Sequence, residues 1–209
     1  TELKVSEVAV GCSGYWGNKN FSEKKAESII LTAFEHGVNF LDTGHNYCNY
    51  NAEPRLGKTI KKILLDHDRS KIILSSKAGT ITPPSTLVSK RNKIVKDFSA
   101  DHIEKSCLES IQNLNCEYLD IFQLHGITES QVSPQLIERL STMREKGLFR
   151  YLGVNTHSES DIRYIAMYPE IFDMVLIDYN LLQLDREPVI KELDNAGVGV
   201  VAGTVLAQG

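Results

Sequence analysis

The strongest constraint on the fold is a regular alternation of strand-like and helix-like segments along the 209 residues. Short apolar runs are followed by segments in which apolar residues recur at helical spacing, as on one face of a helix. Such an alternation predicts βαβ units and therefore a parallel sheet. The expected strands cover residues 7–12, 38–43, 71–77, 118–125, 150–155, 172–180 and 197–206.

Several helix boundaries carry their own signals. Ser22 is expected to cap a helix that ends at Gly37, and Ser133 followed by Pro134 is typical of a helix start. Further helices are expected through Leu56, from Ser99, from Ser158 and from Pro188. The longer insert at residues 78–98 lacks this periodicity, and we expect it to form a loop over one face of the sheet.

Two parallel architectures fit this alternation, a doubly wound sheet and a (β/α)8 barrel. The first strand–helix connection contains Gly11, Gly14 and Gly17, but their even spacing does not match the GxGxxG fingerprint of dinucleotide-binding doubly wound sheets. Seven regularly spaced strands favour the barrel. We therefore predict an α/β fold, a (β/α)8 TIM-type barrel with about seven of its strands in the chain. A single domain is expected over residues 1–209, with the C-terminal unit missing.

Composition excludes several classes of function. The chain is 42% hydrophobic and 24% charged with a net charge of −4, which is ordinary for a globular protein. The cationic stretch at 90–93 is short, and we expect it to be solvated, so charge gives no support for nucleic-acid or membrane-surface binding. No apolar run approaches the ~18 residues that a membrane span needs.

The cysteines and the N-terminal segment indicate the compartment. Cys12, Cys48, Cys107 and Cys116 include no CxxC pair, which argues against a zinc site, an iron–sulfur site or a disulfide framework. Isolated thiols fit a reducing cytosol, and the first residues lack the pattern of a secretory signal. We therefore expect a cytoplasmic protein with no metal site.

Polar side chains stand at the ends of three strands that should be neighbours. The second, third and fourth expected strands end at Asp42, Lys77 and His125. Active sites of parallel barrels lie at the carboxyl ends of the strands, which are about 4.8 Å apart, so Lys77 should lie between the other two. Tyr47 follows the second strand closely enough to lean over the same mouth.

These four residue types together suit proton donation. A tyrosine has an ordinary pKa of about 10, and a nearby lysine cation lowers that pKa because it stabilises the phenolate. Asp42 can supply the counter-ion for Lys77, and His125 can hydrogen-bond a substrate carbonyl. Each residue alone has an ordinary explanation. Asp42 could form a turn and Lys77 could face solvent. His125 could be a core histidine and Tyr47 a surface aromatic residue. Their convergence on one mouth favours a general acid for a developing alkoxide.

The motifs around these residues resemble the aldo-keto reductases, in the order of that family and over nearly the whole chain. They are GVNFLDTGHNY at 37–47 followed by Glu53 and Gly57, LSSKAG at 74–79, YLDIFQLHG at 118–126, KGLFRYLGVNTHS at 146–158, YN at 179–180 and GVGVVAGTVLAQG at 197–209. The resemblance implies a barrel that binds NADPH without a doubly wound sheet. It also implies hydride transfer between nicotinamide and a carbonyl carbon.

The resemblance assigns roles to individual residues. The implied catalytic tetrad is Asp42, Tyr47, Lys77 and His125, with Tyr47 as the proton donor. The implied NADP contacts are Asn155, Thr156, Thr204 and Leu206. Tyr15 and Trp16 in the first loop are expected to line the substrate pocket, with packing under the loop as the alternative for Trp16. His45, near the mouth, is expected to contact the substrate.

Three positions depart from the commoner pattern of the family. Asn155-Thr156 stand where a Ser-Asn pair usually holds the nicotinamide amide, Leu176 replaces a glutamine, and Gly203 replaces an aromatic residue that stacks under the nicotinamide. The departures leave two alternatives open: a non-redox lyase, dehydratase or isomerase that uses the same acid–base site, and a regulatory subunit that keeps the barrel as a scaffold.

The expected partner is a small-molecule carbonyl compound or alcohol, with no nucleic acid and no membrane. An open sheet edge, where an eighth strand should pair, leaves room for a homo-oligomer because unpaired strand edges favour association.

Overall fold

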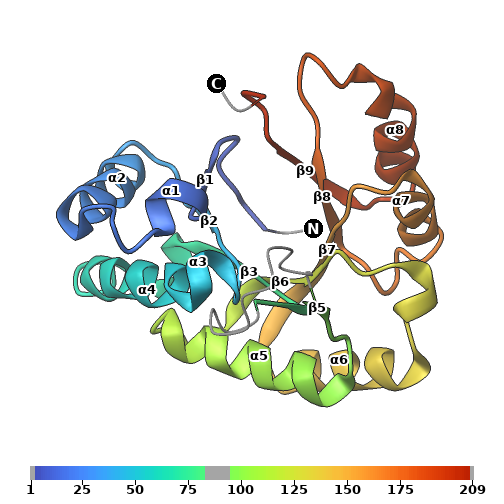
Figure 1. Ribbon diagram of the computed structural model, residues 1–209, viewed down its shortest axis with the longest axis horizontal. Coiled ribbons are helices and arrows are strands. Elements are labelled where there is room, and N and C mark those ends of the chain that lie inside the picture. The colour runs from blue at the N-terminus through green and yellow to red at the C-terminus, as the bar shows by residue number, and fades with distance from the viewer. Residues whose placement is uncertain (1–2, 83–94, 208–209) are drawn as a thin grey trace, which may run out of the picture.

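Seven parallel strands form one sheet that curls into a half-barrel, with helices on its outer side (Figure 1). The computed structural model describes residues 3–82 and 95–207. The strand order is β1-β2-β3-β6-β7-β8-β9, so each strand pairs with the one before it and the predicted α/β barrel architecture is confirmed. These strands are β1 (Ala9–Gly11), β2 (Phe40–Asp42), β3 (Ile73–Ala78), β6 (Leu119–His125), β7 (Phe149–Asn155), β8 (Met174–Asp178) and β9 (Gly199–Gly203).

The sheet is buried on both faces because both sides of its central strands carry apolar residues. All six residues of β3 are buried, and six of the seven in β6 are buried. The outer face packs against the helices to form the larger core. A smaller cluster lies on the concave side, built around Phe40, Ile73, Ile121 and Met174. This apolar floor lies below the carboxyl ends of the strands, where the candidate site is found.

The helices follow the strands as expected from the alternation. They are α1 (Gly14–Gly17), α2 (Glu23–Glu35), α3 (Tyr47–Tyr50), α4 (Ala52–Ile63), α5 (Ala100–Asn113), α6 (Pro134–Glu145), α7 (Glu159–Ala166) and α8 (Glu187–Asn195), with short 3-10 turns at Arg69–Lys71, Glu129–Gln131 and Leu184–Arg186. Ser22 caps α2 and Ser133 caps α6, since their hydroxyl oxygens accept from Lys25 N at 3.4 Å and Leu136 N at 3.2 Å. Both predicted N-caps are therefore confirmed.

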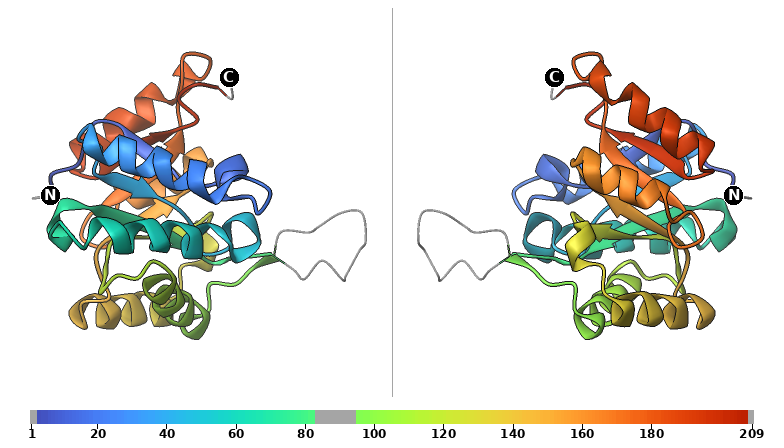
Figure 2. Two further views of the ribbon diagram at one scale, coloured as in Figure 1. Left: turned by 90° about the vertical axis from the view of Figure 1, so that its left-hand side faces the viewer. Right: turned by 90° about the vertical axis from the view of Figure 1, so that its right-hand side faces the viewer.

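The insert at 78–98 was expected to form a loop, and its central residues 83–94 lie outside the described residues. Its described ends form a two-stranded antiparallel hairpin, β4 (Thr80–Ile81) with β5 (Val95–Lys96). Backbone pairing and the bond from Lys96 Nζ to Thr80 Oγ1 at 2.6 Å hold these ends together. Figure 2 shows the hairpin at the same end of the molecule as α1 and α3. The cationic stretch at 90–93 lies outside the described residues.

The remaining general features concern thiols, metal ligands and membranes. The four cysteines are free. Within residues 3–82 and 95–207, no group of three or more His, Cys, Asp or Glu side chains is arranged to hold a metal ion. None of the helices in the same ranges is long and apolar enough to cross a membrane. In the described chain β1 and β9 are the two edges of the sheet, and self-association through them stays a prediction.

Candidate active site

A buried ion pair forms the base of the site. Asp42 ends β2 and Lys77 lies near the end of β3, and both side chains point to the concave side of the sheet because alternate strand residues share a face. Lys77 Nζ lies 2.5 Å from Asp42 Oδ2 and also donates to Thr43 O at 2.7 Å. Only 1% of the Lys77 side chain is exposed, so its charge depends on these two acceptors.

The loop after β2 brings Tyr47 over this pair. Thr43 N donates to Ser75 O and His45 N donates to Lys77 O, each at 2.9 Å, so the loop continues along β3. A turn then closes through Tyr47 N and Gly44 O at 3.0 Å. A Cβ on Gly44 would lie 3.0 Å from the Tyr47 ring, so glycine lets the ring fold back. The ring centroid lies 5.0 Å from Lys77 Nζ.

A left-handed turn follows the tyrosine and separates it from α4. Cys48, Asn49 and Tyr50 have φ values of 55°, 54° and 62°, a region that costs L-residues roughly 1–2 kcal/mol each. Neighbouring contacts hold the turn: Cys48 Sγ donates to Gly14 O at 3.3 Å, and Thr82 N donates to Tyr50 Oη at 3.2 Å. The helix expected through Leu56 is present as α4, and the left-handed turn lies between Tyr47 and the start of that helix.

His125 completes the cluster from the end of β6. Its ring meets the Tyr47 ring edge-on, with centroids 5.5 Å apart and an interplanar angle of 81°. Lys96 Nζ donates to the backbone carbonyl of His125 at 2.5 Å. Burial, with Lys96 and then Lys77 as nearby cations, lowers the pKa of His125 from 6.5 to about 3. The imidazole is therefore neutral at ordinary pH and keeps one N–H to donate.

Burial changes the expected electrostatics of Tyr47. We expected Lys77 to lower its pKa, but burial of the phenol is the larger effect, and the pKa is raised above 10.0 despite Lys77. Burial alone would lower the pKa of Lys77, but Asp42 and then Tyr47 outweigh it, so that pKa is raised. The site therefore holds a charged lysine beneath a neutral phenol, which is the protonation state that a proton donor requires.

Sequence reasoning missed two polar residues that support this site. Gln123 Nε2 donates to Asp42 Oδ1 at 2.9 Å, and Lys96 binds the His125 carbonyl. A signal for Gln123 was present, because a polar residue two positions before His125 in an apolar strand must share its face. Lys96 carried no such signal, since its position depends on the β4–β5 hairpin.

The three residues expected to contact the substrate lie apart from one another. Trp16 is buried and its Nε1 donates to Ala26 O at 3.1 Å, which is the packing role named as its alternative. Tyr15 is 73% exposed on α1. His45 is buried, and its Nε2 lies 2.9 Å from Glu109 Oε2 on α5. Substrate contact by these side chains stays a prediction.

The residues expected to hold the cofactor lie at the ends of β7 and β9, which flank β8 in the sheet. Asn155 pairs with His125 in the β6–β7 register and lies opposite Leu176 in the β7–β8 register. Asn155 Nδ2 donates to Leu176 O at 3.2 Å, and no donor among the described residues reaches Asn155 Oδ1. Thr156 is buried beside it and Thr204 Oγ1 donates to Asp178 Oδ1 at 3.1 Å, whereas Leu206 is 78% exposed.

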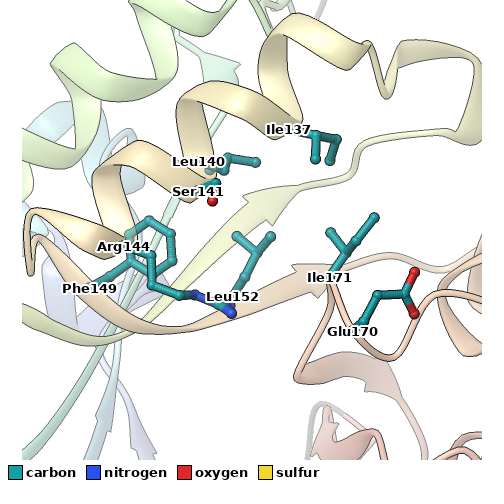
Figure 3. A pocket seen from close by; sticks show the side chains of 8 residues that line it. All are labelled: Ile137, Leu140, Ser141, Arg144, Phe149, Leu152, Glu170 and Ile171. Atoms are coloured by element: carbon teal, nitrogen blue, oxygen red, sulfur yellow. The ribbon is translucent and has the colours of Figure 1, made fainter.

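A separate cavity lies on the outer side of the sheet, away from the tetrad (Figure 3). Side chains of α6, β7 and the loop before β8 line it, namely Ile137, Leu140, Ser141, Arg144, Phe149, Leu152, Glu170 and Ile171. Two of the lining side chains are charged, Arg144 and Glu170, and Arg144 is bound to Asp173, the residue before β8, at 2.5 Å.

Comparisons with known proteins agree with this geometry. L-galactose dehydrogenase from Arabidopsis thaliana is 29% identical over the whole chain and 64% of its own length. The holo form of the aldo-keto reductase AKR11C1 from Bacillus halodurans is 26% identical with a TM-score of 0.81, over 98% of this chain and 64% of that one. An aldo/keto reductase from Klebsiella pneumoniae, described in complex with NADP and acetate, has the same fold at 19% identity and a TM-score of 0.77, over 98% of this chain and 65% of that one.

The chain spans 58–64% of the length of the first curated relatives that it matches. The family model for the aldo/keto reductases covers a larger share of the chain itself, because it matches residues 8–209. This match includes every strand of the half-barrel and all four residues of the tetrad. The chain therefore belongs to the aldo/keto reductase family.

Proposed function

We propose that the protein reduces a carbonyl substrate to an alcohol with NADPH, or catalyses the reverse oxidation, and that Tyr47 donates the proton. The observation that carries this proposal is the buried Lys77–Asp42 ion pair beneath the Tyr47 ring, with His125 edge-on to that ring. A neutral phenol above a lysine cation can give up its proton as negative charge develops on the substrate oxygen, because the cation stabilises the resulting phenolate.

Each member of the tetrad has a distinct part in this step. His125 is neutral and can donate an N–H to the carbonyl oxygen, which orients that oxygen toward the Tyr47 hydroxyl. Lys77 stays charged because Asp42 compensates its burial. The substrate oxygen then receives the phenolic proton while the carbonyl carbon receives the hydride that NADPH supplies when bound.

The residues at the nicotinamide end fit the cofactor in part. Asn155 lies beside His125, and its Oδ1 can accept a hydrogen bond from a carboxamide N–H. A structural neighbour is described as bound to NADP, which supports the choice of nucleotide. Thr156, Thr204 and Leu206 complete the proposed contacts, on the strength of the family resemblance.

Nucleotide binding and turnover test the proposal separately. The purified protein should quench or shift NADPH fluorescence on binding, and should oxidise NADPH only when an aldehyde or ketone is added. Tyr47→Phe should still bind NADPH but lose roughly 10²–10⁴ in kcat, because the general acid is gone. Absence of NADPH binding by the wild-type protein, or an undiminished kcat in Tyr47→Phe, would contradict the proposal.

A non-redox reaction at the same site is the second candidate. It is favoured by Leu176, an apolar side chain in place of an amide, which lies 3.2 Å from the position of a Cβ on Gly203. A tyrosine above a lysine can move a proton next to a carbonyl without any hydride. Turnover of a hydroxycarbonyl compound in the absence of nucleotide would favour this candidate, whereas strict dependence on NADPH would exclude it.

A further inference from the structure

A buried glutamine holds the carboxylate of the tetrad from the side opposite the lysine. Gln123 is fully buried on β6, two residues before His125 and therefore on the same face. Its Nε2 donates to Asp42 Oδ1 at 2.9 Å and to Ser75 Oγ at 2.6 Å. Lys77 binds the other Asp42 oxygen at 2.5 Å. The two oxygens of one carboxylate are thus held by a cation and by a neutral amide from different strands.

The orientation of this amide follows from the charge of Asp42. Gln123 Oε1 is buried and has no hydrogen-bond partner among the described residues. Rotating the amide would turn that oxygen toward the Asp42 carboxylate and place two acceptors against each other. An unsatisfied buried acceptor is unfavourable for folding, and an apolar side chain of similar size would avoid it. The glutamine is therefore suited to the carboxylate rather than to core packing.

The neighbouring strand leaves space for the glutamine. Gly153 on β7 lies beside Gln123 in the strand register, and a Cβ there would lie 2.9 Å from Gln123 Cγ. That separation is shorter than real Cβ contacts allow, so any other residue at 153 would displace the amide. Glycine at 153 therefore leaves room for the Gln123 side chain, whose amide reaches Asp42.

The hydrogen bond also bears on the proton donor. After burial and Lys77, the charge of Asp42 is the next influence on Tyr47, and it raises the pKa of the phenol. An N–H donor on Asp42 Oδ1 compensates part of the negative charge of the carboxylate. Without that donor, the carboxylate would oppose phenolate formation more strongly.

We propose that Gln123 is a positioning residue, whose amide keeps one oxygen of Asp42 on Lys77 and limits the influence of the carboxylate on Tyr47. This inference rests on the proposed function, because it gives Gln123 a part in proton donation. It concerns a residue outside the tetrad and predicts a measurable change in the acidity of Tyr47.

Gln123→Met tests it by removing the N–H donor at nearly constant volume. We expect kcat for carbonyl reduction to fall about tenfold, since the phenol becomes a weaker acid. The alkaline limb of the kcat profile should move to higher pH, while KM and the Kd for NADPH stay unchanged. The matched control is Ser75→Ala, which removes the other acceptor of the same amide and should leave the pH profile in place.

A titration that needs no turnover separates this inference from the proposed function. The phenolate absorbance of Tyr47 is obtained as the difference between each protein and the same protein carrying Tyr47→Phe. This absorbance should appear at higher pH in Gln123→Met than in the wild-type protein. If the wild-type protein shows no NADPH-dependent reduction, the proposed function fails while the titration still decides the role of Gln123. An unchanged phenol titration, or an equal change in Ser75→Ala, would overturn the inference.

Gln123→Glu keeps the shape of the side chain if Gln123→Met does not fold. Two carboxyl groups in hydrogen-bond contact cannot both ionise freely, so they share a proton. The pH profile of the phenol titration should then gain a second ionisation. A profile identical to that of the wild-type protein would show that the residue at 123 is not coupled to Tyr47.

Discussion

Lys77 and Asp42 form an ion pair with unequal burial: 1% of the lysine side chain is exposed, against 13% of the aspartate side chain. The lysine has no solvent access and relies on Asp42 and the carbonyl of Thr43. Asp42 retains contact with solvent and a second donor in Gln123. The two charges therefore depend on each other to different extents.

This asymmetry predicts unequal costs for neutralising the two partners. Asp42→Asn leaves a buried cation without its counter-ion and should lower the free energy of unfolding by about 3–5 kcal/mol. Lys77→Met should lower the free energy of unfolding by less, because Asp42 keeps the hydrogen bond from the Gln123 amide and its contact with solvent. Denaturant unfolding of the two single variants and of the double variant measures these losses. The loss in the double variant should be smaller than the sum of the two single losses, because the two residues interact. Equal losses in the two single variants would contradict the argument.

The lowered pKa of His125 predicts a loss of stability in acid. In the unfolded chain this imidazole binds a proton near pH 6.5, whereas in the folded protein it does so only near pH 3. Between these values the unfolded state binds more protons, so stability decreases as the pH falls, by up to about 1.4 kcal/mol per pH unit from this group. Unfolding of the wild-type protein and His125→Gln across this window should show a steeper decline for the wild type. Parallel declines would mean that His125 does not titrate as described.

The order of strands and helices could be predicted because each element satisfies a local rule. Alternating periodicity predicted all seven strands of the sheet, and Ser22 and Ser133 were recognisable as caps. The tetrad followed from the same rules, since parallel strands end at one edge and Asp42, Lys77 and His125 stand at three consecutive ends. Family resemblance then assigned their roles.

Features that depend on tertiary contacts could not be predicted in the same way. The left-handed turn after Tyr47 is stabilised by Gly14 and Thr82, which belong to other loops. The direction of the Tyr47 pKa shift depends on how deeply the ring is buried, and a sequence carries no measure of that depth. The contact of His45 with Glu109 depends on where α5 packs, and the sequence carried no signal for it.

The left-handed turn predicts opposite responses at one exposed position. Asn49 has a φ of 54°, which glycine adopts without steric cost and a β-branched residue does not. Asn49→Gly should leave the free energy of unfolding unchanged or slightly higher, while Asn49→Val should lower it by about 1–2 kcal/mol. Thermal unfolding of the two variants measures the difference. A valine variant as stable as the glycine variant would indicate that the turn is not left-handed at this residue.

A final prediction separates a structural role for His45 from the substrate contact that its position in the sequence suggested. His45 Nε2 lies 2.9 Å from Glu109 Oε2, and the His45 backbone N–H donates to Lys77 O, so the side chain ties the Tyr47 loop to α5. His45→Gln and Glu109→Ala each remove or weaken this one hydrogen bond and should lower stability by a similar amount, about 1 kcal/mol.

The kinetic response distinguishes the two roles. If His45 anchors the loop, both variants should reduce kcat by a similar factor through the misplaced Tyr47, and KM for the carbonyl substrate should change little. Glu109 is the decisive partner, because it lies on α5 and its side chain points to His45 from the helical layer. A raised KM in His45→Gln with normal kinetics in Glu109→Ala would instead assign His45 to the substrate.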